Sequence, residues 1–255
     1  MIKAKKKFGQ NFLKDELVKQ QIIQAIPKDL KAKLIEIGPG LGDLTAPILK
    51  SGFKLTSFEI DDSLIPILNE RFNKEILSGD FTLINADVMN VKISDEPYFI
   101  CANLPYYISS QIIINALFDD NCIGMLVMIQ KELADRFFGI DYCALSVITD
   151  LLCDKVNVCE VPPSAFTPMP KVNSSVIKLI KKPSLLDKKD LKAFNSFIKI
   201  AFNQPRKKML SSFSNKTKVK QALDKLEIDE NKRAHEIPVK SFLELFKLLK
   251  DENEY

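Results

Sequence analysis

The 255-residue chain is 46% hydrophobic and has a formal net charge of +4, which suits a globular protein with a core and excludes a disordered chain. Its longest apolar runs are far shorter than the roughly 20 residues that span a bilayer, so we expect no membrane partner. Five cysteines without a C-x-x-C pair and one histidine, His235, argue against a zinc site, a disulfide framework and histidine-based catalysis. The basic start lacks the apolar stretch of a secretory signal, and we expect a cytoplasmic protein without a metal.

The first two-thirds of the chain alternate β-rich apolar runs with helical patterns, as in a parallel sheet with crossover helices. The expected strands are residues 34–37, 55–59, 82–86, 98–102, 125–130, 156–160 and 175–180. The expected helices are residues 42–50, 62–72, 109–118 and 144–152. Only a proline-rich loop, residues 161–173, separates the last two strands, so we expect them to form an antiparallel pair at one edge.

After residue 183 the pattern is helical only. Apolar residues recur with a period near 3.6 in three segments, which contain Phe194, Leu223 and Phe246. The sequence therefore predicts an α/β fold in two domains. Residues 1–183 form a Rossmann-like domain with a mostly parallel sheet and an antiparallel edge strand, and residues 184–255 form a small all-α domain.

A glycine-rich turn, Glu36-Ile37-Gly38-Pro39-Gly40-Leu41-Gly42, follows the first strand and opens a helix. Glycines at such a turn let the main chain approach a nucleotide-like ligand. The spacing is G-x-G-x-G and differs from the dinucleotide fingerprint, and an acidic residue stands two positions before Gly38. S-adenosylmethionine has no pyrophosphate and has a cationic amino-acid end, so this turn suits it.

Polar residues end the next three strands. Glu59 lies 21 positions after Gly38, close to the spacing at which an acidic side chain reaches ribose hydroxyls. Asp87 ends the third strand and Asn103 the fourth. Because a ligand of an open α/β sheet lies across the carboxyl ends of the strands, we expect these four residues to face one crevice.

Asn103, Leu104, Pro105 and Tyr106 form an Asn-x-Pro-Tyr motif at the end of the fourth strand. An exocyclic amine of adenine is a poor nucleophile, because its lone pair is delocalised into the ring. The Asn103 side-chain oxygen and the main-chain carbonyl of Leu104 or Pro105 can accept its two N–H bonds and aim the nitrogen at a sulfonium methyl. Tyr106 offers a stacking face for the base, and Phe166, in a proline-framed loop, is a candidate second wall. The motif alone indicates an amine acceptor, since similar motifs serve adenine, cytosine and amide nitrogens.

Positive charge is concentrated in two segments. Residues 178–220 contain thirteen Lys and Arg residues against two acidic ones, and residues 1–19 contain six against two. Such segregation favours a polyanionic partner, although Lys-rich helices also occur simply because they are soluble. We expect the Lys-rich start and the segment with Arg206, Lys207 and Lys208 to contact RNA.

The motifs together resemble those of the ribosomal RNA adenine N6-dimethyltransferases, specifically the small-subunit (16S) enzymes. The resemblance covers nearly the whole chain and includes Phe8-Gly9-Gln10-Asn11-Phe12-Leu13 and residues 36–42, 103–106, 130–132, 161–176 and 201–208. It implies a class I S-adenosylmethionine-dependent methyltransferase domain whose cofactor pocket is lined by Asn11, Leu13, Gly38, Glu59, Asp87 and Asn103. It also implies dimethylation of two neighbouring adenosines near the 3′ end of 16S ribosomal RNA in a small-subunit precursor, with S-adenosylhomocysteine as product.

Two alternatives remain open at this point. One is a 23S adenine methyltransferase of the macrolide-resistance type, against which Pro39, Leu41 and Leu104 argue. The other is a non-catalytic assembly factor that uses the fold only to bind RNA.

Two features depart from the family pattern: Cys143 stands where the family often has glycine, and residues 137–141 form a short loop. We expect a monomer.

Overall fold

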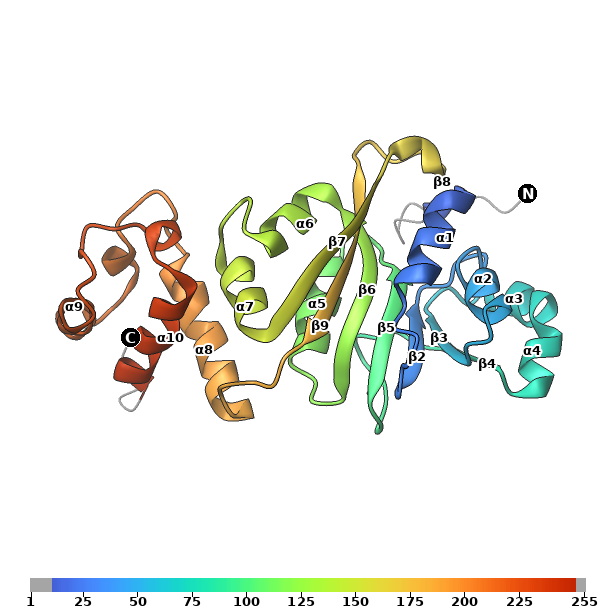
Figure 1. Cartoon of the computed structure of the whole chain (residues 1–255), viewed down its shortest axis with the longest axis horizontal. Helices are drawn as coiled ribbons and strands as arrows, with labels where there is room; N and C mark the ends of the chain where they lie inside the picture. The colour runs from blue at the N-terminus through green and yellow to red at the C-terminus, as the bar shows by residue number, and fades with distance from the viewer. Residues whose placement is uncertain (1–10, 251–255) are drawn as a thin grey trace. The chain divides into compact units, whose positions relative to one another are not determined.

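The computed structural model of the chain describes residues 11–250 and divides into two compact units (Figure 1). The first unit combines the chain up to residue 134 with residues 155–181, and the second combines residues 135–154 with the chain from residue 182 onward. The Lys-rich start and Phe8-Gly9-Gln10 lie outside the described residues. No helix within residues 11–250 is long and apolar enough to cross a membrane.

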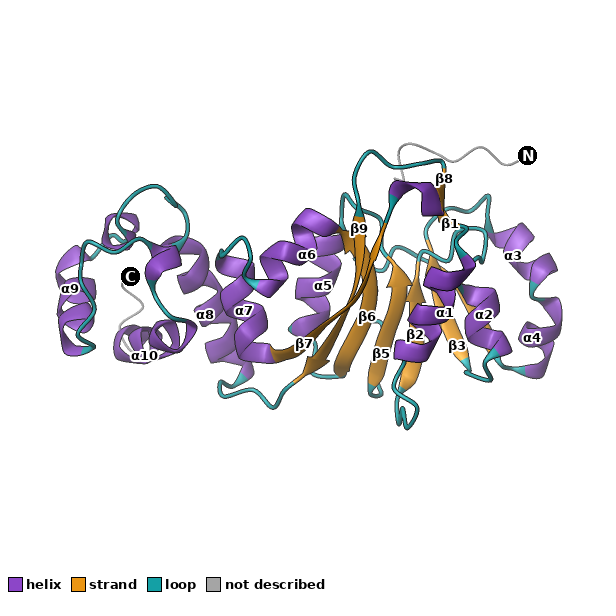
Figure 2. Cartoon of the chain, turned by 45° about the horizontal axis from the view of Figure 1, so that its top comes forward, coloured by secondary structure: helices purple, strands orange, loops and turns teal. Residues whose placement is uncertain are grey.

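A seven-stranded sheet forms the centre of the first unit (Figure 2). Its order is β4-β3-β2-β5-β6-β9-β7, with β2 Lys33–Ile37, β3 Leu55–Glu59, β4 Phe81–Asn85, β5 Tyr98–Asn103, β6 Cys122–Gln130, β7 Cys153–Val161 and β9 Ser174–Lys181. Strands β2 to β6 pair in parallel, and β9 runs antiparallel to β6. Each expected strand is present, with ends shifted by a few residues. The last two strands are neighbours at one edge, but the antiparallel strand β9 lies second from that edge and β7 lies outside it.

Helices follow the strands of this unit. They are α1 Glu16–Ala25, α2 Thr45–Lys50, α3 Ile65–Arg71, α4 Asn73–Ser78 and α5 Ser109–Leu117, and α6 Lys131–Phe138 begins here. The sequence predicted α2, α3 and α5 but not α1, α4 or α6. The missed signal for α1 is Asp15, whose carboxylate accepts the N–H groups of Leu17 and Val18 at 2.9 and 3.1 Å and so caps the helix.

One hydrophobic cluster joins α1 and α2 to one face of the sheet. Val18 and Ile22 of α1 and Ile48 of α2 belong to the same buried cluster as Phe99 and Cys101 of β5. These two β5 residues are two positions apart. Because side chains alternate between the faces of a strand, both lie on the same face of the sheet. Burial of a large apolar side chain contributes about 1.5–3 kcal/mol, so this cluster stabilises the packing of α1 and α2 on the sheet.

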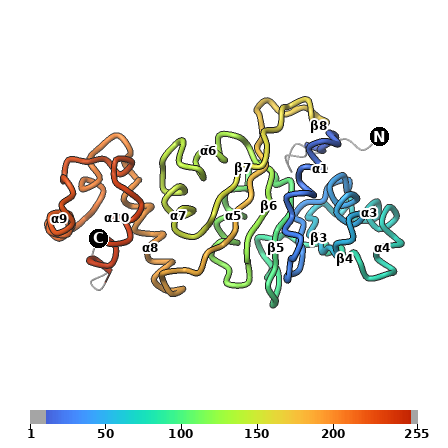
Figure 3. The backbone as a smooth tube through the Cα atoms, viewed as in Figure 1, coloured from blue at the N-terminus to red at the C-terminus, as the bar shows by residue number. Residues whose placement is uncertain are grey.

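A short two-stranded ribbon lies apart from the main sheet. Strand β1, Phe12–Leu13, pairs antiparallel with β8, Phe166–Thr167. The backbone trace shows β8 close to the start of α1, although more than 140 positions separate them in the chain (Figure 3). Neither strand was predicted, because two residues are too few to show a periodic pattern.

The second unit is helical. Its helices are α7 Ala144–Leu152, α8 Lys188–Ala201, α9 Lys216–Lys225 and α10 Val239–Leu249, with short 3₁₀ turns at Met209–Ser212 and Ala234–Glu236. The three expected C-terminal helices are present. Residues 135–154, which include α7 and the first two residues of β7, group with this unit. The Tyr142 hydroxyl donates to the carbonyl of Ile237 at 3.0 Å and its ring contacts Phe202. The assignment of separate roles to the two domains stays a prediction.

The two departures from the family pattern are both stabilised by local bonds. The main-chain N–H of Cys143 donates to the Ser146 hydroxyl at 3.0 Å, at the start of α7. The expected loop 137–141 is shorter than predicted, because α6 continues to Phe138; after it Gly139 adopts a φ of +77°, and Arg136 pairs with Asp141 at 3.2 Å. Cysteine at position 143 therefore serves as an extended N-cap residue and needs no glycine conformation.

Candidate active site

The glycine-rich turn lies at the carboxyl end of β2 and leads into α2. Gly38, Gly40 and Gly42 have φ values of +68°, +61° and +83°, a region that side chains disfavour. A Cβ on Gly42 would lie 2.4 Å from the Phe72 ring, whereas one on Gly38 would meet nothing closer than 3.9 Å. Glycine at 42 is therefore required for space as well as for conformation, and the main chain at Gly38 is open to a ligand.

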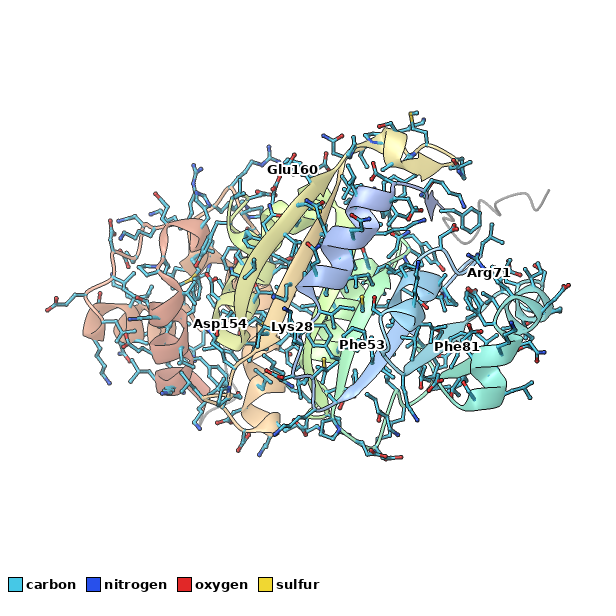
Figure 4. All side chains as sticks on the ribbon, turned by 45° about the vertical axis from the view of Figure 1, so that its right-hand side comes forward. Lys28, Phe53, Arg71, Phe81, Asp154 and Glu160 are labelled. Atoms are coloured by element: carbon cyan, nitrogen blue, oxygen red, sulfur yellow. The ribbon has the colours of Figure 1, made fainter. Side chains whose placement is uncertain are left out.

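Arg71, labelled in Figure 4, ends α3 and contacts the glycine-rich turn. Its guanidinium donates a hydrogen bond to the main-chain carbonyl of Leu41 and lies 5.2 Å from the ring centroid of Phe72. The same Phe72 ring occupies the space beside Gly42. The last turn of α3 and the residue after it thus fix the conformation of the glycine-rich turn.

Two adjoining pockets lie at the carboxyl ends of the strands. The first is lined by Asn11, Phe12, Leu13, Glu36, Gly38, Pro39, Gly40, Asp43, Leu44, Glu59, Ile60, Asn103, Leu104, Pro105, Tyr106 and Tyr107. It contains five of the six residues predicted to bind the cofactor. The sixth, Asp87, lines a smaller pocket that shares Gly38, Ile60, Pro105 and Tyr107 with the first. The fold therefore brings the predicted residues to one place, while their role in binding stays a prediction.

Glu36 lies beneath the turn with only 2% of its surface exposed. One of its carboxylate oxygens, Oε2, accepts the hydroxyls of Thr45 at 2.7 Å and Ser57 at 2.8 Å. Burial raises the pKa of Glu36 to about 7; the two hydroxyls oppose that rise and nearby Glu59 adds to it. A cationic ligand in the pocket would favour the ionised form of this carboxyl group.

Glu59 ends β3 and holds its carboxylate beside the turn. Its two oxygens accept the main-chain N–H groups of Gly40 at 3.1 Å and Asp61 at 2.8 Å. Burial raises the pKa of Glu59, and these two hydrogen bonds oppose that rise. The Glu59 side chain is therefore fixed at the pocket wall by the main-chain N–H groups of Gly40 and Asp61.

Asp87 lies two residues beyond the last residue of β4. Its carboxylate accepts the Met89 N–H at 2.9 Å and the Asn90 side-chain amide at 3.1 Å. The pocket that it lines has apolar walls that include Ile60 and Ile112. An apolar slot with one acceptor at its edge suits a flat aromatic ring that carries an amino group.

Asn103 ends β5, and its side chain is oriented by the residue just before β1. The side-chain nitrogen of Asn103 donates to the main-chain carbonyl of Asn11 at 3.0 Å. Because an amide side chain donates through nitrogen and accepts through oxygen, this bond leaves Oδ1 as the acceptor that remains for a ligand. This is the orientation required if Oδ1 accepts an N–H bond from a substrate amine.

The structure distinguishes the two main-chain carbonyls of the motif. The Leu104 N–H donates to the Met128 carbonyl at 3.1 Å, which holds the motif against β6. The Pro105 carbonyl accepts the Ile108 N–H at 3.2 Å. Within residues 11–250 no hydrogen bond engages the carbonyl of Leu104, so it is the better of the two candidates for a second acceptor.

The two predicted aromatic walls lie in different surroundings. Tyr106 lines the first pocket, and its hydroxyl lies 2.6 Å from the Ser174 hydroxyl; burial raises the pKa of Tyr106. Phe166 is only 4% exposed and belongs to the buried cluster that contains Leu13, and it is not among the residues that line either pocket. The structure therefore does not bring the two rings together, and a wall at Phe166 would require its ring to become exposed.

The predicted RNA-binding residues 206–208 belong to the second unit, where they are exposed in the turn that follows α8. The ammonium group of Lys208 donates to the Asn231 side chain, and the Met209 N–H donates to the Lys232 carbonyl at 2.9 Å. These bonds place a second exposed basic pair, residues 232–233, beside the first segment. Sequence reasoning missed this pair because the two segments are separated along the chain.

Further residues at the site were not anticipated. Phe12, Asp43, Ile60 and Tyr107 all line the first pocket. The Tyr107 side chain is 61% exposed, and its place directly after the Asn-x-Pro-Tyr motif could have indicated it. Among the described residues, no group of three or more His, Cys, Asp and Glu side chains is placed to hold a metal ion.

The features of the site have a common chemistry. A glycine-rich turn over two buried acids is suited to a cationic nucleoside ligand, and an amide oxygen on the next strand of the sheet can hold an amine beside it. The parallel sheet places both at its carboxyl edge. Together, this fold and this site define a Rossmann-like methyltransferase.

The chain belongs to the ribosomal RNA adenine dimethylase family, whose model matches residues 1–251. It is 44% identical over 260 residues to Ribosomal RNA small subunit methyltransferase A of Campylobacter jejuni (strain RM1221). The matched region covers 99% of this chain and 97% of that protein. The protein of the same name from Sulfurimonas denitrificans is 41% identical over 97% of this chain and 94% of its own length. The predicted family is confirmed, and the chain is an enzyme that dimethylates adenine in ribosomal RNA.

Solved structures agree with this assignment. The 23S rRNA methyltransferase ErmE superposes with a TM-score of 0.73 at 26% identity, over 94% of this chain and all of that one. A dimethyladenosine transferase from Plasmodium falciparum has a TM-score of 0.78 at 24% identity, over 94% of this chain and 98% of that one, and at this identity supports the fold alone. The predicted Rossmann-like α/β fold is confirmed.

Proposed function

We propose that this chain uses S-adenosylmethionine to dimethylate N6 of two adjacent adenosines near the 3′ end of 16S ribosomal RNA, within a small-subunit precursor. The observation that carries the proposal is the pocket that joins the glycine-rich turn to Asn103, in a chain whose relatives at 39–44% identity bear the name Ribosomal RNA small subunit methyltransferase A. The product of each transfer is S-adenosylhomocysteine. We also propose that the enzyme acts as a cytoplasmic monomer.

The residues of the two pockets fit the methyl donor. Glu36 and the turn at Gly38 suit its cationic amino-acid end, Glu59 suits the ribose hydroxyls, and the apolar slot at Asp87 suits the adenine ring. Asn11 and Leu13 complete the lining of the first pocket. When bound, S-adenosylmethionine supplies an electrophilic methyl group on a sulfonium.

The Asn-Leu-Pro-Tyr motif would prepare the amine. The Oδ1 atom of Asn103 and the carbonyl of Leu104 accept the two N–H bonds of the N6 amino group, which turns the nitrogen lone pair toward the methyl carbon. Transfer of the methyl group would join that carbon to the nitrogen and leave the donor as S-adenosylhomocysteine, and the surplus proton would leave to these acceptors or to water. The ring of Tyr106 supports the base, with its hydroxyl fixed by Ser174.

The second unit would contact the RNA backbone. Residues 206–208 are exposed and basic, and the bonds of Lys208 and Met209 set residues 232–233 beside them. A surface of this kind binds phosphates without reading sequence, and its affinity falls as salt concentration rises. The Lys-rich start would add to this contact.

The likeness to the 23S enzyme, at 26% identity, favours one other candidate, which is methylation of large-subunit RNA. The decisive experiment incubates the chain and S-adenosylmethionine with a precursor of either subunit and maps dimethyladenosine on the RNA. Modification of two adjacent adenosines in 16S RNA alone is the expected result. Modification of 23S RNA would support the other candidate. No modification, together with no thermal shift on addition of S-adenosylhomocysteine, would point to a non-catalytic RNA-binding factor.

A further inference from the structure

Residues 11–15, which we call the N-terminal strap, form part of the wall of the first pocket. Three of them, Asn11, Phe12 and Leu13, line it. The strap is bonded to Asp43 after the glycine-rich turn, to Asn103 of the Asn-x-Pro-Tyr motif and to the loop that contains Phe166. Each of these attachments joins parts of the chain that are distant in sequence.

The attachment to the glycine-rich turn is an ion pair. The ammonium nitrogen of Lys14 lies 2.6 Å from Oδ2 of Asp43, the residue directly after Gly42. The Lys14 side chain is 45% exposed and that of Asp43 is 16% exposed, so the pair is partly shielded from water. The Lys14 nitrogen also lies 5.8 Å from the ring centroid of Phe12, within cation–π range.

Two further contacts join the strap to the glycine-rich turn and to Asn103. The Phe12 ring lies so close to the turn that a Cβ on Gly40 would be 3.0 Å from it. The Asn11 carbonyl accepts the side-chain amide of Asn103. Because these contacts lie within a few residues of Lys14, displacement of Lys14 from Asp43 would loosen the bond that orients Asn103.

The strap is also bonded to the loop of Phe166. The Ala165 carbonyl accepts the N–H groups of Lys14 at 2.7 Å and Asp15 at 3.3 Å, next to the β1–β8 ribbon. Lys14 therefore takes part in two bonds at once, through its side chain to the turn and through its main chain to the loop. Displacement of Lys14 would therefore disturb its contact with the turn and its contact with the loop together.

We propose that Lys14 and Asp43 are positioning residues that fasten the N-terminal strap over the cofactor pocket, so that the Asn11 carbonyl keeps the Asn103 amide in its reactive orientation. The proposal rests on the proposed function for the identity of the ligand. Partly exposed ion pairs contribute little to the stability of a whole protein. The effect of losing this one is expected to be local, at the pocket.

The test uses the full-length chain and S-adenosylhomocysteine as the ligand, with calorimetry for its affinity and single-turnover methylation of a 16S precursor for the chemical step. The variants are Lys14→Met, Asp43→Asn, Lys14→Arg and the charge exchange Lys14→Asp with Asp43→Lys. Lys33→Met is the matched control, because Lys33 pairs with Glu96 at 2.9 Å with a similar exposure of 49%, at the opposite end of β2.

We expect Lys14→Met and Asp43→Asn each to weaken S-adenosylhomocysteine binding by about three- to fivefold, and to slow the chemical step, with little change in melting temperature. Lys14→Arg and the charge exchange should recover most of both, and Lys33→Met should match the wild type. Wild-type S-adenosylhomocysteine affinity and a wild-type rate of the chemical step in Lys14→Met would overturn the proposal. So would a loss in Asp43→Asn that the charge exchange leaves unrepaired, because Asp43 would then act on the ligand directly.

Amide hydrogen exchange supplies a readout that does not depend on activity. In the wild type, S-adenosylhomocysteine should slow exchange in residues 11–15, and in Lys14→Met this protection should shrink. Equal protection in both proteins would contradict the proposal. A wild type that binds no S-adenosylhomocysteine would instead refute the proposed function, so the two failures can be told apart.

Discussion

The side-chain nitrogen of Asn103 lies 3.0 Å from the main-chain oxygen of Asn11, although 92 positions separate the two residues. This bond joins the residue that would hold the substrate amine to a segment that lines the same pocket. It also decides which end of the amide is available, because the nitrogen is already engaged. The chemistry expected of the motif therefore depends on a contact with a residue that is distant in the chain.

Replacement of Asn103 by alanine is expected to reduce methyl transfer by at least about a hundredfold, because the amine loses the acceptor that orients its lone pair. S-adenosylhomocysteine should still bind and raise the melting temperature, since the glycine-rich turn and its acids remain. Methyl incorporation and thermal shift are the two measurements. Asn115→Ala, at an exposed position of α5, is the control. Full activity in Asn103→Ala would refute the assigned role.

Replacement of Tyr106 tests the stacking face. Tyr106→Ala should cost about 1–3 kcal/mol of base binding, or about 5- to 150-fold in kcat/KM for RNA. Tyr106→Phe keeps the ring and loses only the bond to Ser174, so its loss should be much smaller. Steady-state kinetics with a 16S precursor measures both. Equal losses in the two variants would assign the effect to the hydroxyl and not to stacking.

Phe166 needs a test that separates the core from the substrate, because its ring is buried. Phe166→Ala should cost about 3–5 kcal/mol of unfolding free energy, as expected for a large core cavity. Phe166→Leu refills most of that space without an aromatic face. If Phe166 forms a second wall, Phe166→Leu should weaken RNA binding while urea unfolding shows a far smaller loss. Wild-type RNA affinity in Phe166→Leu would leave Phe166 with a role in the core only.

The buried Glu36 predicts a specific pH dependence. Burial raises its folded-state pKa from the ordinary 4.5 to about 7, so its contribution to stability is fully present below about pH 4.5 and is lost as the pH rises to about 7. The loss is on the order of 3 kcal/mol. Glu36→Gln should flatten the stability curve in this window, as urea unfolding at several pH values would show. S-adenosylmethionine affinity should rise with pH over the same interval, because a cation favours the ionised carboxylate. Identical curves in both proteins would contradict the assignment.

The basic segment predicts a salt dependence. The logarithm of RNA affinity should fall with the logarithm of salt concentration, with a slope of about −0.7 for each phosphate contacted on a single strand. Replacement of Arg206, Lys207 and Lys208 by glutamine should make that slope shallower, as filter binding at several salt concentrations would measure. The same change at the exposed Lys28, Lys31 and Lys54, which lie in the first unit, should have a smaller effect. An unchanged slope in the first variant would exclude residues 206–208 as a contact.

Local pattern was enough to locate the strands, because a buried parallel strand requires a run of apolar residues wherever it lies in the sheet. It also located Gly38, Glu59 and Asn103, since each lies at the end of such a run or directly after it. Short elements escaped it. The two residues of β1 and of β8 are held by their pairing with one another, and a pairing between distant segments leaves no periodic trace in either.

The sequence by itself determined the class of fold, the glycine-rich turn and the residue types of the reaction centre, because these depend on local spacing and on chemistry that particular side chains require. The tertiary structure alone decided which atoms are available for that chemistry. It engaged the nitrogen of Asn103 with Asn11, left the carbonyl of Leu104 as the better acceptor, and buried Phe166 beside Leu13. Contacts between distant residues depend on how the whole chain packs, so the orientation of an amide and the burial of a ring cannot be deduced from the order of residues.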